Sequence, residues 1–510
     1  MIFESKKNAK RNIKAGIINK IILMAFPFVI NYFINIYLGI EYLGVKSLFT
    51  SILTVLNLSE LGFSSAMVYH MYEPVANDNY VKINALLNLY NKVYKVIGIT
   101  ITILGIFLMP FLPLLIKGGA PDNLNIYIVY IIELINTSIS YFLFGYRQSL
   151  LVAYQREDVI SITGLVCQTG LKLLQIVLLV FSKNYYYFIL CTPFFTVLNN
   201  ILIYAFTQKM FPFAKCEGIL DKTDILSIKK LVTGTFIQKA CDATRNSLDS
   251  ICISAFIGLS LTAIYNNYYT IFSYVNLGLS VILSAITACV GNHLITKSKC
   301  DNFEEMEKID FLYLIIHGFC TIMIASLIQP FMCMWMGEDM LLPLKTLILY
   351  SLYFYAGGIG KVRAVYYSAK GLWWEMRFRS IAETICNVTL NIGLGYLYGL
   401  NGIIFATIIS LLIVNFIWGN IILFKSYFGI CYLKRYYSYQ IKYFLISGII
   451  FLIVSIVENR IRFQNVFYNL LGRAIIGTLL TIILYFMFYW KSKIFKDAIR
   501  MVVNQSEKIS

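Results

Sequence analysis

Long apolar segments separated by short polar breaks constrain this chain more than any other feature. About fourteen of them are long enough to cross a bilayer, which takes about 20 residues of helix. Of all residues, 59% are hydrophobic and only 14% are charged, whereas soluble proteins carry roughly 25% charged residues. So few charges could not cover a soluble domain of this length. We therefore predict an all-α polytopic membrane protein and exclude a soluble enzyme, a disordered chain and a secreted disulfide scaffold. The predicted spans cover approximately residues 17–38, 47–70, 92–116, 125–146, 159–181, 186–207, 231–257, 261–293, 310–336, 342–368, 378–398, 401–424, 441–457 and 471–490.

Lys and Arg are distributed unevenly between alternate loops. The N-terminal tail and every second loop are rich in both, while the opposite loops hold few, namely Lys46, Lys117, Lys183, Arg460 and Arg462. Positively charged loops remain in the cytoplasm, so we predict a bacterial cytoplasmic (inner) membrane protein with both termini in the cytoplasm. These loops also account for the net charge of +17, and no nucleic-acid partner is predicted.

The second half of the membrane region repeats landmarks of the first. The matching pairs are Leu38-Gly39 with Ile257-Gly258, Gly44 with Ala263, Pro110-Phe111 with Pro330-Phe331, Gly118 with Gly337, and Ala153 with Ala369. Two six-helix lobes related by an axis along the membrane normal would explain these matches. We expect an N-terminal lobe at 1–208, a cytoplasmic linker at 209–230, a C-terminal lobe at 231–424, and two further helices with a cytoplasmic tail at 425–510. Paired lobes suggest alternating access around a central cavity.

Charged residues within the predicted spans are the main functional signal. A charge facing lipid at mid-bilayer costs about 2.5–3.5 kcal/mol. In the span 231–257, four charged residues share a helix face about 120° wide, and they are Lys239, Asp242, Arg245 and Asp249. This face is expected to point inward, either as a self-neutralising ion-pair network or as the lining of a water-filled cavity.

Other spans carry polar stripes that we assign to two roles. The in-span cations favour an anionic substrate, phosphate above all, and the predicted substrate-binding residues are Lys172, Lys239, Arg245, Lys361, Arg363, Asn31 and Asn35. Buried carboxylates can take up H⁺ or Na⁺, and the predicted ion-coupling residues are Glu60, Glu133, Asp242, Asp249 and Glu383. The carboxylates could instead only balance the cations, and any one Asn could serve helix packing alone.

Motifs of enzymes, nucleotide sites and metal sites were not found. The 11 cysteines lie mostly in apolar runs, with no C-x-x-C pair and no histidine partner at metal spacing, so neither a metal nor a disulfide framework is predicted. No cofactor is expected beyond a coupling ion. Any active transport would then draw on an ion or substrate gradient.

Two stretches resemble the polysaccharide flippases of the multidrug/oligosaccharidyl-lipid/polysaccharide (MOP) exporter superfamily, the Wzx-type repeat-unit flippases. The first is LGIEYLGVKSLFTSILTVLNLSELGFSSAMVYHMYEPVANDN, residues 38–79, and the second is NSLDSICISAFIGLSLTAIYNNYYTI, residues 246–271. The resemblance implies a MATE-like two-lobed transporter with a cationic cavity. It further implies a cargo of polyprenyl-pyrophosphate-linked oligosaccharide, flipped across the cytoplasmic membrane for O-antigen, capsule or exopolysaccharide synthesis. Flippases of peptidoglycan precursors carry arginines in their first two helices, where this chain offers Asn31, Asn35 and Glu60.

The predicted function is therefore a non-enzymatic, ion-coupled flippase that works as a monomer. Its expected partners are the lipid-linked substrate, membrane lipids, and the polymerase and glycosyltransferases of the same pathway. One alternative is a cation-coupled multidrug exporter of the same fold, which the surplus of cations in the spans disfavours. A second is a membrane glycosyltransferase or polymerase, which the short outer loops disfavour.

Overall fold

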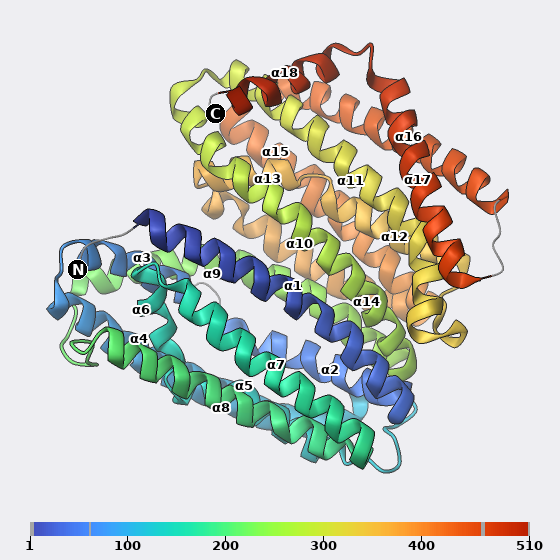
Figure 1. Ribbon diagram of the computed structural model, residues 1–510. Coiled ribbons are helices and arrows are strands. Elements are labelled where there is room, and N and C mark those ends of the chain that lie inside the picture. The colour runs from blue at the N-terminus through green and yellow to red at the C-terminus, as the bar shows by residue number, and fades with distance from the viewer. Residues whose placement is uncertain (1–4, 61–62, 461–464, 508–510) are drawn as a thin grey trace. The chain divides into compact units, whose positions relative to one another are not determined.

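The computed structural model describes residues 5–60, 63–460 and 465–507, and every regular element in these ranges is a helix (Figure 1). The all-α prediction is thereby confirmed, and each predicted span overlaps at least one helix. By length and composition, eight helices of the described ranges can cross a membrane, or nine if a pair bent by 53° forms one span. One of the eight, residues 373–428, contains a kink at Gly399, between the predicted spans 378–398 and 401–424. The count of fourteen crossings stays a prediction.

The chain forms two compact units, Met1–Ala263 and Ile264–Ser510. In the first, α7 packs against α1 and α8, α5 packs against α4 and α8, and α2 packs against α9. Figure 1 shows α1, α7 and α8 side by side. The helices of this unit are α1 (Ser5–Tyr37), α2 (Ile40–Leu56), α3 (Phe63–Ala76), α4 (Tyr80–Leu108), α5 (Ile126–Phe142), α6 (Gln148–Ala153), α7 (Glu157–Ser182), α8 (Tyr185–Met210) and α9 (Lys222–Phe256).

The second unit is built around α11, which packs against α12, α16, α17 and α18. Helix α10 begins in the first unit and continues into the second. The elements of this region are α10 (Leu259–Thr296), α11 (Lys299–Met336), α12 (Leu344–Gly358), α13 (Lys361–Lys370), α14 (Trp373–Ile409), the π-helix η5 (Ser410–Trp418), α15 (Gly419–Leu423), α16 (Leu433–Arg460), α17 (Val466–Tyr489) and α18 (Lys493–Glu507). The predicted lobe limits at 208, 230 and 424 differ from this division at residue 263 and stay a prediction.

Short polar side chains begin several of the helices. The side chains of Asn79, Asn125, Asn184 and Ser298 each accept a hydrogen bond from a backbone N–H in the first turn of α4, α5, α8 and α11. These caps satisfy donors that would otherwise lack a partner at a helix start. The polar breaks of the sequence therefore also set the ends of the helices.

The repeated glycines adopt matching backbone conformations. Gly39, between α1 and α2, has φ 102°, and Gly258, between α9 and α10, has φ 134°. Gly118 and Gly337 have φ 86° and 97°. Side chains rarely tolerate this left-handed region, so both pairs mark tight turns that need glycine. The internal repeat seen in the sequence thus has a counterpart in the backbone.

Large apolar side chains cover much of the exterior. Phe107, Phe181 and Leu452 are 71%, 83% and 59% exposed. So much exposed apolar surface is expected for helices that face lipid. Together with the apolar helices long enough to span a bilayer, it defines a multi-pass membrane protein.

Candidate functional site

Polar side chains from four helices of the first unit meet in one cluster. Lys46 on α2 donates from Nζ to Oδ1 of Asn31 on α1 at 2.7 Å. Lys172 on α7 donates to Oε1 of Gln175 at 3.1 Å, and the charges of Lys46 and Lys172 both act on Glu133 of α5. We call these five residues the unit-1 cationic cluster.

The charge of this cluster is unbalanced. Two lysine side chains act electrostatically on one carboxylate, and Lys46, Glu133 and Lys172 are all half-buried. Charges act more strongly in such a partly dehydrated environment than in water. The cluster can therefore attract an anion while it remains within reach of solvent or a ligand.

The cluster brings together site residues that were predicted on three different spans. Asn31, Lys172 and Glu133 are predicted site residues, and Asn35 lies half-buried one turn further along α1. The placement of Lys46 in an outer loop is wrong, because α2 begins at Ile40, seven residues before the predicted span 47–70. The turn glycine at Gly39, with an apolar helix directly after it, is the signal that could have placed Lys46 in a helix.

The charged face of α9 is graded in exposure. Lys239 is exposed and donates to Oγ of Ser65 on α3 at 3.4 Å. Arg245 pairs with Asp242 across one turn at 3.4 Å, and their side chains are 13% and 49% exposed. Asp249 is buried. The weak Arg245–Asp242 pair leaves this face partly open rather than sealed.

Glu60 is held by two tyrosines of the first unit. The hydroxyl of Tyr94 on α4 donates to Oε1 and that of Tyr141 on α5 donates to Oε2, each at 2.5 Å. Tyr90 donates in turn to the Tyr94 hydroxyl at 3.1 Å. A half-buried carboxylate bonded in this way is a suitable ion-binding or proton-accepting group.

Arg363, predicted to bind substrate, is enclosed within the second unit. It is 2% exposed. Its Nη1 donates to the backbone oxygens of Asn415 and Phe416 at 2.5 and 3.1 Å, and its Nη2 donates to Oδ1 of Asn415 at 2.7 Å. A Cβ atom at Gly419 would lie 2.3 Å from Nη1, so that glycine makes room for the guanidinium. The position of Arg363 fits a structural role around the π-helix.

Glu383 is also bonded within its own unit. It accepts from Arg379 at 2.7 Å and from Nδ2 of Asn415 at 2.8 Å, and both charged side chains are nearly inaccessible. Asn387 continues the network to Thr407 at 3.0 Å. In contrast, Lys361 is exposed at the start of α13. Of the predicted residues of the second unit, Arg363 and Glu383 therefore meet in one buried network through Asn415.

Asp310 is one of several buried carboxylates that are absent from the predicted site residues. Asp310 on α11 is fully buried and accepts hydrogen bonds from Gln440 and Tyr439 of α16. Its Oδ1 has no hydrogen-bond partner in the described part of the chain. The predicted span 310–336 starts at Asp310, so the sequence places this residue at the end of a membrane span. In the structure Asp310 lies inside α11, which begins at Lys299.

Solved structures with the same arrangement of helices are transporters. A structure of the lipid II flippase MurJ in an inward closed conformation aligns with a TM-score of 0.68 and 17% identity, covering 92% of this chain and 98% of that one. An inward-facing multidrug resistance MATE family transporter of the MOP superfamily aligns with a TM-score of 0.55 and 12% identity, covering 78% and 94%. The D35N mutant of the MATE transporter VcmN from Vibrio cholerae aligns with a TM-score of 0.54 and 13% identity, covering 82% and 97%. No protein-family model and no curated protein sequence matches the chain.

These alignments define the fold of the protein. It is a polytopic membrane protein whose helices are arranged as in the solved lipid II flippase and MATE transporter structures. In the alignment with the lipid II flippase, the shared fold extends over 92% of this chain.

Proposed function

We propose that this protein is a non-enzymatic flippase for a polyprenyl-pyrophosphate-linked oligosaccharide used in cell-surface polysaccharide synthesis. The observation that carries the proposal is the unit-1 cationic cluster, in which Lys46 and Lys172 outnumber Glu133. A pyrophosphate is the anionic group of such a lipid, and ammonium groups bind phosphate as point charges. The similarity to a lipid II flippase supports a lipid-linked cargo.

In this mechanism the cations hold the pyrophosphate while the polar residues shelter the sugars. The proposed substrate contacts are Lys46, Lys172 and Asn31, with Asn35 beside them, and Lys239, Arg245 and Lys361 as further cations. The lipid tail remains in the bilayer, and the two lobes alternate access. Arg363 is assigned to structure because both of its Nη atoms donate hydrogen bonds within its own unit.

Ion coupling is assigned to the carboxylates. Glu60 is the foremost candidate because it is half-buried and held by two phenols. Glu133, Asp242 and Asp249 are secondary candidates. Glu383 is already paired with Arg379, so it would couple ions only if that pair opened. The protein would lie in the bacterial cytoplasmic membrane with both termini in the cytoplasm, as a monomer beside the polymerase and glycosyltransferases of its pathway.

A transport assay with the purified protein tests the proposal. The protein is reconstituted into liposomes with a fluorescent polyprenyl-pyrophosphate oligosaccharide, and the lipid that reaches the outer leaflet is quantified with an impermeant quencher. We expect transport by the wild-type protein and a loss of about tenfold or more in Lys46→Gln and Lys172→Gln, since a hydrogen bond to a charged group contributes roughly 1.5–3 kcal/mol.

Lys95→Gln, at an exposed position of α4, is the matched control and should transport normally. Equal rates in all of these variants would contradict the assignment of the cluster.

A multidrug exporter remains the second candidate, because two MATE transporters share the fold. Expression in a pump-deficient host distinguishes it. Resistance to cationic drugs without transport of the lipid-linked oligosaccharide would favour the exporter.

A further inference from the structure

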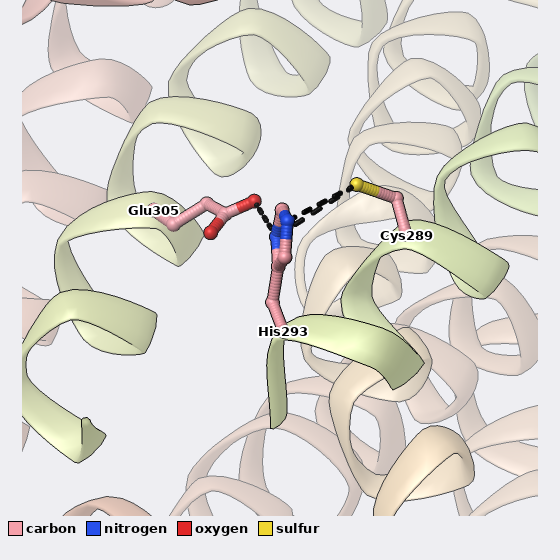
Figure 2. A group of neighbouring side chains, drawn as sticks. All are labelled: Cys289, His293 and Glu305. Atoms are coloured by element: carbon pink, nitrogen blue, oxygen red, sulfur yellow. Dashed lines mark hydrogen bonds and ion pairs between the residues drawn. The ribbon is translucent and has the colours of Figure 1, made fainter. Parts of the chain in front are cut away.

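Three potential metal ligands meet where α10 and α11 join. Figure 2 shows the imidazole of His293 between the thiol of Cys289 and the carboxylate of Glu305. Sγ of Cys289 lies 3.7 Å from Nδ1 of His293, and that nitrogen lies 2.6 Å from Oε1 of Glu305. The ligand atoms of all three residues lie within 4.8 Å of one another.

The spacing of these atoms suits a tetrahedral metal ion. Zinc binds nitrogen at about 2.0–2.1 Å and sulfur at about 2.3 Å, so a tetrahedral angle places the two ligand atoms about 3.6 Å apart. The thiol and Nδ1 are already close to this separation. The carboxylate oxygen would need to move from its hydrogen bond to roughly 3.3 Å from Nδ1, a small rotation of a long side chain.

Lys297 is the obvious competitor for such an ion. Its Nζ lies 2.7 Å from Oε2 of Glu305 and 3.3 Å from Nδ1 of His293. The shorter contact of Lys297 is with Oε2 of Glu305, whereas the imidazole contacts Oε1. Lys297 can therefore stay bonded to Oε2 while Oε1 binds a metal. A bonded carboxylate of this kind is common around metal sites, where outer partners orient the ligands.

The turn that carries the ligands is fixed without a metal. Nδ2 of the fully buried Asn302 donates to the backbone oxygens of His293 and Lys297 at 3.1 and 3.2 Å. It also lies 3.0 Å from the Tyr427 hydroxyl. Glu305 is largely buried, with a side chain 9% exposed, whereas His293 is 22% exposed. The site is therefore held in place and can be reached from solvent.

We propose that Cys289, His293 and Glu305 form a Zn²⁺ site that fastens α10 to α11, a role separate from the proposed transport function. A thiolate, a neutral imidazole and a carboxylate are ligands that zinc prefers. The thiolate and carboxylate together balance the charge of the ion. Cys289 and His293 are four residues apart on one helix, a metal-binding spacing that the sequence analysis did not recognise.

Cobalt substitution tests the site on the full-length purified protein. We expect one equivalent of Co²⁺ to produce a thiolate-to-cobalt charge-transfer band, which Zn²⁺ then removes by displacement. Cys289→Ser should abolish the band. His293→Gln and Glu305→Gln should weaken Co²⁺ binding by about tenfold or more, since changes in the outer shell alone cost 10- to 100-fold.

Cys386→Ser is the matched control, because Cys386 is another half-buried cysteine of the second unit. Its band should equal that of the wild-type protein. No thiolate band in the wild-type protein, or a band that survives Cys289→Ser, would overturn the proposal.

A second measurement needs no variant. Zn²⁺ should slow the alkylation of Cys289 in the wild-type protein, as followed by peptide mass spectrometry, and leave that of Cys386 unchanged. Equal alkylation of Cys289 with and without Zn²⁺ would show that Cys289, His293 and Lys297 form only a hydrogen-bonded network with Glu305.

Discussion

Arg147 and Arg363 hold similar positions in the two units, each a few residues after the end of a helix. Arg147 follows the end of α5 and bonds to Oε1 of Gln208 and the backbone oxygen of Ala214 at 3.3 and 3.5 Å. Arg363 follows the end of α12 and bonds to Asn415. Both arginines are buried, with 6% and 2% exposed. Each unit therefore has a buried arginine, shortly after a helix end, that bonds to a later part of the chain.

Replacing Arg363 should destabilise the protein. In Arg363→Gln the backbone oxygens of Asn415 and Phe416 lose their donor in a buried environment. A group left unsatisfied costs about 1–3 kcal/mol, so we expect a loss of about 2–4 kcal/mol in total. Thermal unfolding in detergent, followed by fluorescence, measures this loss. An unchanged melting temperature would contradict the structural role of Arg363.

The buried pair of Arg379 and Glu383 gives a prediction about non-additivity. Arg379→Met leaves an uncompensated buried carboxylate and should cost about 3–5 kcal/mol. The double variant Arg379→Met, Glu383→Met removes both charges and should lose less than the single variant. Thermal unfolding of these two variants and of Glu383→Met checks this order, and a loss in the double variant equal to the sum of the two single losses would rule out a direct pair.

Gly44 is needed because two backbones approach closely within the first unit. A Cβ atom there would lie 2.3 Å from the backbone oxygen of Leu259, so Gly44→Ala should reduce the melting temperature and the yield of folded protein. Gly164→Ala on α7 is the control, since no other atom lies within 4 Å of the place that its methyl group would take and alanine favours helix by about 1 kcal/mol. Similar effects at both positions would refute the close contact.

Glu60 should determine the ion dependence of transport. Glu60→Gln removes the charge that the hydroxyls of Tyr94 and Tyr141 stabilise, so transport into liposomes should no longer respond to an imposed H⁺ or Na⁺ gradient. Glu73→Gln, at an exposed position of α3, should respond as the wild-type protein does. A gradient response that persists in Glu60→Gln would exclude this carboxylate from coupling.

Arg245 should matter for the cargo more than for folding. Its ion pair with Asp242 is long, at 3.4 Å, and its side chain is 13% exposed, so Arg245→Ala should lower the melting temperature through lost packing and still leave the protein inserted. It should nevertheless abolish surface polysaccharide in cells that depend on this protein. The exposed Lys229→Ala on the same helix is the control. Normal surface polysaccharide from a well-expressed Arg245→Ala strain would argue strongly against the proposed function.

The helical membrane architecture and many of its breaks could be predicted from the order of residues. An apolar run inserts because of the transfer free energy of its own residues, and a turn at Gly39 or a cap at Asn184 depends on nearby residues alone. These are local properties, so the pattern of the chain is sufficient to predict them.

Which charges are compensated became visible only in the folded chain. Lys46 and Arg363 are both cations within helices, yet Lys46 contacts Asn31 in a cluster with surplus positive charge, whereas Arg363 is enclosed by the backbone of η5. The partners of Lys46 and Arg363 lie on other helical segments, 15 and 52 residues away in the sequence, and Glu305 likewise lies on a different helix from Cys289 and His293. Burial and pairing arise from helix packing, and no local pattern of residues encodes them.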